Sequence, residues 1–121
     1  MAKIIKRGDL WLVNLEPGFG REIRKKRPAL VVSGNSIHIG TTHVIIVPAS
    51  TQVPNTVGIE MVLVNKKDGL RQQSVLLPVF IRSIDQERLI KRIGTVTKTK
   101  LQEVEDAMKI VLDLRGENYL Q

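Results

Sequence analysis

The sequence contains no cysteine, and this absence removes several kinds of chemistry. Without thiols the chain has no disulfide, no thiolate nucleophile and no cysteine metal site, a composition that fits a reducing cytoplasm. Aromatic residues are also scarce, at four in 121 residues, so the stacking platform of a single-strand binder is largely missing. No apolar run approaches transmembrane length, and charge interrupts the N-terminal apolar pair Ile4-Ile5 before a signal-peptide core can form. We therefore expect a cytoplasmic protein that does not use a membrane.

Familiar catalytic motifs are missing as well. The sequence has no glycine-rich phosphate motif with its lysine, and no Ser-His-Asp order that indicates a triad. His38 and His43 are the only histidines, and no neighbouring carboxylate is placed to orient either ring. We expect both to be routine loop or strand residues, with a catalytic base or a metal ligand as the alternative.

Positive charge is the most prominent feature that the sequence does have. Nineteen Lys and Arg oppose twelve Asp and Glu, which gives a net charge of +7. This balance favours nucleic acid or another acidic partner, although it says nothing about the fold. The length suits a single domain over residues 1–121 with one hydrophobic core, since no repeat or linker divides the chain.

The charge is concentrated in a glycine-containing segment, residues 17–27, which precedes a short apolar run. One acid, Glu22, stands there against five cations, which are Arg21, Arg24, Lys25, Lys26 and Arg27. Such a loop favours a polyanion, and a solvated turn kept soluble by its charge is the alternative. Because a proline restricts the residue before it, Pro28 should hold Arg27 in one direction at the rim of a sheet. Pro28 itself fits the first position of a strand, where no backbone donor is needed.

Apolar and β-branched patterns predict a mainly β protein. The expected strands cover residues 9–15, 29–33, 42–49, 58–64, 74–81 and 90–96. The first two should pair as a hairpin with the basic loop at its tip, and Gly34-Asn35 should then turn the chain. Residues 42–49 form a continuous apolar run, typical of a strand buried on both faces. Pro78 must lie at a sheet edge or a bulge.

The C-terminal segment has a helical pattern instead. Thr97 is the expected N-cap and Gly116 the expected end, and apolar residues recur between them at helical spacing. A short helical turn should precede the last strand. We therefore predict a small, strongly curved antiparallel sheet, an SH3-like partly closed barrel, with an amphipathic C-terminal helix packed on it.

One pair of positions could form a site at the edge of this sheet. If strands 29–33 and 42–49 run antiparallel in one sheet, Arg27 and Ser50 lie at the same edge. A fixed guanidinium with the hydroxyls of Ser50 and Thr51 can bind a phosphodiester and favour the charge of a pentacoordinate transition state. The alternative is a turn hydroxyl that caps its own backbone.

Short motifs in a fixed order resemble the MazF/PemK family of toxin endoribonucleases. They are residues 8–17, Gly20-Arg21-Glu22, residues 27–32, residues 48–52, Gly69-Leu70 with Ser74-Val75, and residues 81–85. The resemblance continues through Arg92-Ile93-Gly94 and covers nearly the whole chain. It implies a small homodimeric barrel-like fold, which gyrase-poisoning toxins also use.

The resemblance also implies an activity and a partner. It implies sequence-specific cleavage of single-stranded RNA such as mRNA, without a metal or other cofactor, by attack of the RNA's own 2′-hydroxyl. The products are a 2′,3′-cyclic phosphate and a 5′-hydroxyl. It further implies a cognate antitoxin whose acidic, disordered tail occupies the RNA groove. A non-catalytic toxin or binding module of the same fold, which holds gyrase or nucleic acid, is the competing hypothesis.

The family's site residues can be carried over by position. Its essential arginine falls on Arg27, its threonine after the third strand on Ser50, and its loop glutamate on Glu22. Expected substrate-binding residues are Arg24, Lys25, Lys26, Thr51, Gln52 and Arg82. Two departures, Ile23 for the usual Gln and Val79-Phe80 for an acid and Gln, favour the non-catalytic hypothesis. The combination of Arg27 and Ser50 favours cleavage.

Overall fold

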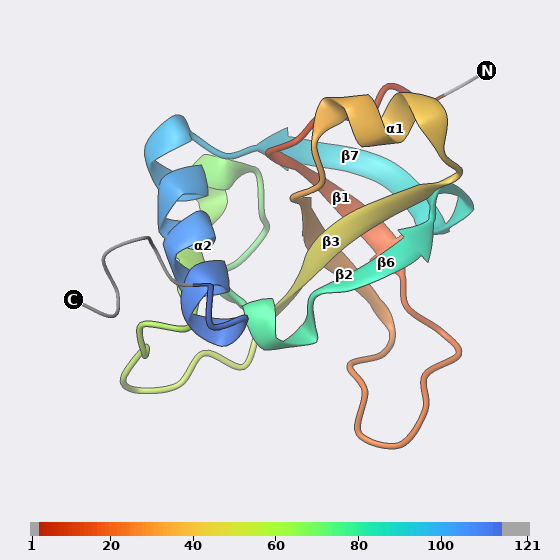
Figure 1. Ribbon diagram of the computed structural model, residues 1–121. Coiled ribbons are helices and arrows are strands. Elements are labelled where there is room, and N and C mark those ends of the chain that lie inside the picture. The colour runs from red at the N-terminus through yellow and green to blue at the C-terminus, as the bar shows by residue number, and fades with distance from the viewer. Residues whose placement is uncertain (1–2, 115–121) are drawn as a thin grey trace.

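The computed structural model describes residues 3–114, which form a curled antiparallel sheet of seven strands with a helix against one side (Figure 1). The strands are β1 (Asp9–Asn14), β2 (Lys26–Val31), β3 (His43–Ser50), β4 (Val62–Val64), β5 (Ser74–Leu76), β6 (Arg82–Asp85) and β7 (Leu89–Thr95). The α-helices are α1 (Asn35–Gly40) and α2 (Lys98–Val111), and the 3₁₀ turns are η1 (Lys66–Asp68), η2 (Pro78–Phe80) and η3 (Gln86–Arg88). The predicted mainly β fold with a C-terminal helix is confirmed.

Strand β3 makes the sheet curl, because it pairs with three different strands along its length. Its first four residues pair with β6, and its last two pair with β5. Its pairing with β2 covers three residue pairs and ends where Ala29 faces Pro48. The strand order β4-β5-β3-β2-β1-β7 follows, with β6 attached to β3. A sheet whose central strand changes partner closes partly on itself, which produces the predicted partial barrel.

Alternating side chains divide the core between the two faces of the sheet. The helix-side face carries Leu10, Leu30 and Val47, which belong to the same buried cluster as Val104 and Ala107 of α2. The opposite face carries a second buried cluster, which includes Trp11, Val13, Ala29, Val31, Val44 and Ile46. Because successive strand residues point to opposite faces, each residue of β1, β2 and β3 can be assigned to one of them.

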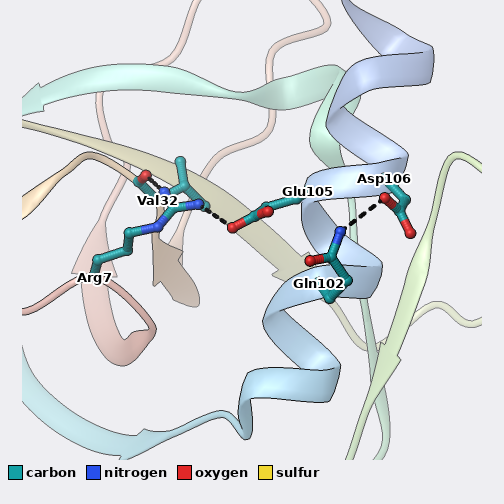
Figure 2. Close-up of polar contacts among 5 residues, drawn as sticks. All are labelled: Arg7, Val32, Gln102, Glu105 and Asp106. Atoms are coloured by element: carbon teal, nitrogen blue, oxygen red, sulfur yellow. Dashed lines mark hydrogen bonds and ion pairs between the residues drawn. The ribbon is translucent and has the colours of Figure 1, made fainter. Parts of the chain in front are cut away.

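Helix α2 is fixed at its start and along its inner side. Thr97 is the N-cap, as predicted, and its hydroxyl oxygen accepts from the Lys100 N–H at 3.1 Å. Arg7 bridges the helix to the sheet, since its guanidinium donates to the Val32 carbonyl and lies 2.6 Å from Glu105 Oε1 (Figure 2).

The predicted end of the helix at Gly116 is wrong. The helix ends at Val111, and Gly116 lies outside the described residues. Asp113 adopts a left-handed conformation with φ 54°, and the Leu114 N–H donates to the Lys109 carbonyl at 2.9 Å. This pattern closes a helix in the way a glycine usually does, and Asp is one of the residues that tolerates it.

The strand boundaries differ from the prediction around the hairpin. Strand β2 starts at Lys26, so Pro28 is its third residue and not its first. The added residues pair with β1, because Arg27 faces Val13 and Lys26 faces Asn14. Pro28 faces Leu12 in the same ladder. The hairpin is therefore longer, and its loop shorter, than the basic segment suggested.

Several other elements also differ from the prediction. The strand expected over 74–81 ends at Leu76, because Pro78 starts the 3₁₀ turn η2, and β6 follows as a strand that was not predicted. Only Val62–Val64 of the expected strand 58–64 is extended. The turn predicted at Gly34-Asn35 instead leads into α1. The predicted helical turn and last strand correspond to η3 and β7.

Candidate active site

Arg27 lies where the β1–β2 loop, residues 15–25, joins strand β2. The loop projects away from the barrel (Figure 1). Arg27 faces Val13 across the ladder, and its side chain is half-buried. Its Nε donates to the Arg24 carbonyl oxygen at 2.5 Å, so the guanidinium is tied to the base of the loop. This hydrogen bond gives the Arg27 side chain a defined direction.

Ser50 lies at the end of β3, on the same sheet edge as Arg27. Extending the β2–β3 register by two residues beyond Ala29 and Pro48 aligns Arg27 with Ser50. Both belong to the opposite face, since Arg27 alternates with Ala29 and Ser50 alternates with Ile46. The antiparallel pairing on which the predicted site depends is therefore present. Within residues 3–114 no hydrogen bond joins the two side chains directly.

The Ser50 hydroxyl has a structural role that still leaves it available. Its side chain is buried, with 9% relative exposure, and its Oγ accepts from the Gln52 N–H at 3.1 Å. This is the backbone-capping role that was the alternative to phosphate binding. A hydroxyl that accepts one hydrogen bond can still donate its own proton. Capping and phosphate binding by Ser50 are therefore compatible.

Glu22 is engaged inside the basic loop. Its Oε1 accepts from the Phe19 N–H at 2.5 Å, and its own N–H donates to the Phe19 carbonyl at 3.1 Å. Arg24 donates to the Gly20 carbonyl at 3.0 Å, and the Lys25 N–H donates to Glu16 Oε1 at 2.9 Å. These contacts give the loop a defined shape with its cations exposed. They hold Glu22 within the loop, and in the part of the chain that the structure describes no hydrogen bond joins Glu22 to Arg27 or Ser50.

The other predicted binding residues are spread around this edge. Lys26 is the exposed first residue of β2, and Thr51 and Gln52 are exposed just after β3. Arg82 lies in β6 opposite Ile46, and so belongs to the same face as Arg27 and Ser50. The structure thus places Arg82 on that face, while Thr51, one residue beyond Ser50, lines a cleft described below.

The two departures from the family pattern have different structural settings. Ile23 packs against the buried cluster of the opposite face, so an apolar residue there helps to anchor the loop. Val79 and Phe80 lie in the turn η2, where Val79 is 63% exposed. An apolar side chain at that exposure leaves position 79 without a polar group for a substrate.

Neither histidine forms a catalytic arrangement. The Ser33 hydroxyl lies 2.6 Å from His38 Nε2, and the Ile5 carbonyl lies 3.1 Å from His38 Nδ1, so this ring links α1 to the N-terminal segment. His43 is exposed at the start of β3 and contacts Thr42 at 3.0 Å. Over residues 3–114 no group of three or more His, Asp or Glu could hold a metal ion. No helix in the same range is long and apolar enough to cross a membrane.

The structure also contains a cleft of about 550 Å³ that the sequence did not predict, near the sheet edge where Arg27 and Ser50 lie. Its lining residues are Leu12, Pro28, Thr51, Gly69, Leu70, Arg71, Gln72, Ser74, Lys91, Arg92 and Ile93. Arg71 and Lys91 are twenty positions apart in ordinary turn and strand contexts, so no sequence signal joined them. They are brought together only because β7 pairs with β1 and the η1–β5 loop folds over that pair.

The sequence model of PemK-like, MazF-like toxins of type II toxin-antitoxin systems matches residues 6–112. The chain belongs to this family. A curated relative, the endoribonuclease MazF9 of Mycobacterium tuberculosis, is 31% identical to this toxin over 116 residues. The match covers 92% of the toxin and 98% of that relative. The resemblance inferred from the motifs is therefore confirmed.

Solved structures agree with the fold of this toxin. MazF of Deinococcus radiodurans superimposes with a TM-score of 0.81 at 23% identity, over 93% of the toxin and all of that chain. An endoribonuclease from a mycobacterial species, solved with its cognate antitoxin, gives a TM-score of 0.76 at 22% identity. That match covers 93% of the toxin and 99% of the other chain. At these identities the structural matches support the barrel-like fold and its topology.

Proposed function

We propose that this toxin is a cytoplasmic, sequence-specific endoribonuclease that cleaves single-stranded RNA such as mRNA, and that residues 1–121 form one toxin domain. The observation that carries the proposal is the alignment of Arg27 with Ser50 on one face at the open end of the β2–β3 pair. A fixed cation beside a hydroxyl suits a phosphodiester, and the cations of the adjoining loop are exposed. The named activity of the mycobacterial relative agrees with this chemistry.

In the proposed mechanism the RNA supplies its own nucleophile. The 2′-oxygen bonds to the adjacent phosphorus as its proton passes to a base, and the bond from phosphorus to the 5′-oxygen breaks. The 5′-oxygen gains a proton, which leaves a 2′,3′-cyclic phosphate and a 5′-hydroxyl. The guanidinium of Arg27 keeps its charge and stabilises the phosphorane, while the Ser50 hydroxyl donates to a non-bridging oxygen. Glu22 is the candidate base.

The proposed RNA contacts extend from this centre in both directions. Arg24, Lys25 and Lys26 contact phosphates and set the position of the strand, whereas base contacts set the sequence that is cut. Thr51, Gln52 and Arg82 are further proposed contacts. No resident metal or other cofactor has a role in these steps.

A homodimer and a cognate antitoxin complete the proposal. The mycobacterial neighbour was solved with its antitoxin, and this toxin carries a net charge of +7. We propose that an acidic, disordered antitoxin tail lies over the basic loop and blocks RNA. Charge complementarity of this kind speeds association and weakens as salt rises.

End-labelled single-stranded RNA, incubated with the purified toxin in EDTA, tests the proposed activity. We expect discrete shortened products whose new 3′ ends carry a cyclic phosphate, which acid treatment opens to a monophosphate. A band that shifts in a native gel while the RNA keeps its full length would instead favour the non-catalytic binding module. The apolar positions Ile23, Val79 and Phe80 would then explain the lack of cleavage.

A further inference from the structure

The cleft opens on the other face of the sheet from Arg27 and Ser50. Leu12 alternates with Leu10 along β1, and Pro28 alternates with Leu30 along β2, so both belong to the helix-side face. Leu12 and Pro28 also face each other in the ladder and line the cleft together. The cleft is therefore separate from the proposed catalytic pair, although only the thickness of the sheet lies between them.

The two faces of the sheet are connected at the open edge where the pairing of β2 with β3 ends. Their pairing stops at Ala29 and Pro48, after which β3 pairs with β5 instead of β2. Pro28 and Thr51 border the cleft, and each directly adjoins a member of the catalytic pair in the sequence. A chain bound at the pair can thus continue around this open edge into the cleft.

The chemistry of the cleft suits one nucleotide. Its floor is apolar, from Leu12, Pro28 and the buried Leu70. Its rim carries exposed Arg71 and Lys91, and within residues 3–114 neither side chain has a hydrogen bond or ion-pair partner. An apolar floor accommodates a base, and free cations at the rim accommodate a phosphate.

The polar side chains and the volume of the cleft also suit one nucleotide. The exposed side chains of Thr51 and Gln72 also line the cleft, and no partner for either occurs in the part of the chain that the structure describes. They can hydrogen-bond to the edge of a base or to a ribose. The volume of about 550 Å³ lies within the range of roughly 300–1,000 Å³ typical of small-ligand sites.

The cleft is held open by close backbone packing. Gly69 has φ +101°, and a Cβ there would lie 2.9 Å from the Ile93 carbonyl oxygen. A Cβ on Gly94 would lie 2.4 Å from the Asp68 carbonyl oxygen. Asn65 caps η1, with its side chain accepting from the Lys67 N–H and its own N–H donating to Asp68. The η1–β5 loop is therefore fixed against β7, and the cleft does not need a ligand to form.

We propose that this cleft binds the base and phosphate of a nucleotide flanking the cleaved bond, with Arg71 and Lys91 holding the phosphate. The proposal rests on the proposed RNA cleavage and adds a subsite on the helix-side face. The proposal makes cleavage depend on RNA length. An RNA that is too short to pass from Arg27 and Ser50 around the open edge into the cleft cannot contact Arg71 and Lys91.

The test compares two double variants on long and short RNA. Arg71→Ala with Lys91→Ala removes the rim cations, and Lys98→Ala with Lys109→Ala is the control, since it removes two exposed lysines of α2. The first substrate is a long RNA that the parent toxin cleaves. The second is the dinucleotide that contains only the scissile bond of that RNA. Thermal melting of both double variants checks that the changes at these exposed side chains leave the fold intact.

On long RNA, the Arg71→Ala, Lys91→Ala variant (the rim variant) should have a lower kcat/KM than the parent. The slope of its log kcat/KM against log salt should be shallower by about 1.4, since each lost phosphate contact contributes about 0.7. From about 50 to 200 mM salt, the parent should therefore lose about sevenfold more than the rim variant. On the dinucleotide, parent and rim variant should be equal. If the rim variant lost the same factor in kcat/KM on both substrates, the proposed subsite would be overturned. The same conclusion would follow if the rim and control variants had equal salt slopes on long RNA. Absence of cleavage by the parent itself would refute the proposed function instead.

Discussion

Arg27 and Ser50 lie on one face of neighbouring antiparallel strands, two residues beyond the last pair that joins those strands. The separation of the strands leaves this edge free of ladder hydrogen bonds between them. A phosphate can therefore approach both side chains, and β3 turns to pair with β5 at the same point. The proposed catalytic centre is thus a consequence of how the barrel closes.

Replacement of Ser50 tests whether its hydroxyl contributes to catalysis beyond its capping role. Ser50→Ala should lower kcat by about 10²-fold, at the lower end of the loss for one oxyanion donor. Ser50→Thr keeps the hydroxyl and should retain most of the activity. The measurement is single-turnover cleavage of end-labelled RNA. Equal activity of the Ala variant and the parent would show that the Ser50 hydroxyl caps the Gln52 N–H and has no role in catalysis.

The salt dependence of RNA binding tests the basic loop. Lys25→Ala with Lys26→Ala should flatten the slope of log affinity against log salt by about 1.4, since each contact on a single strand contributes about 0.7. The order of preferred sequences should stay the same, because phosphate contacts carry no sequence information. Binding to RNA that lacks the attacking 2′-hydroxyl separates affinity from cleavage. An unchanged slope would indicate a solvated loop or one that contacts only the antitoxin.

The bridge between the N-terminal segment and α2 should contribute to stability. Arg7→Ala removes the bonds to Glu105 and to the Val32 carbonyl, and should lower the free energy of unfolding by about 1–2 kcal/mol. Gln102→Ala is the matched control, since Gln102 is exposed and hydrogen-bonds to Asp106 on the side of the helix away from Arg7 (Figure 2). Urea unfolding measures both variants. A loss no larger than that of the control would show that the bridge is not stabilising.

The backbone contact between η1 and β7 predicts a sensitive glycine. Gly94→Ala would place a Cβ 2.4 Å from the Asp68 carbonyl oxygen, and should destabilise the fold by about 1–3 kcal/mol. Gly40→Ala is the control, because nothing lies within 4 Å of a Cβ at that position. Gly40→Ala should be neutral or slightly stabilising. Similar melting temperatures for the two variants would contradict the close approach.

Local patterns predicted the parts of the fold that depend on neighbouring residues. Alternation in residues 9–15 and the proline after Arg27 identified the hairpin and its cationic loop, and Thr97 identified the start of α2. Partner changes along β3 have no local signal, because they depend on which strands meet after folding. Hence Arg27 and Ser50 could be placed at one edge, but Arg71 and Lys91 could not be placed in one cleft.

Measuring RNA cleavage and RNA binding by the Arg27→Ala variant is the most direct test of whether Arg27 stabilises the transition state of RNA cleavage. Single-turnover cleavage of end-labelled RNA in EDTA gives the chemical step, and RNA lacking the attacking 2′-hydroxyl gives the affinity. Because the phosphorane carries charge that the bound RNA lacks, cleavage should fall by about 10²–10³-fold or more while affinity changes far less. Full cleavage by Arg27→Ala would contradict both the site and the mechanism.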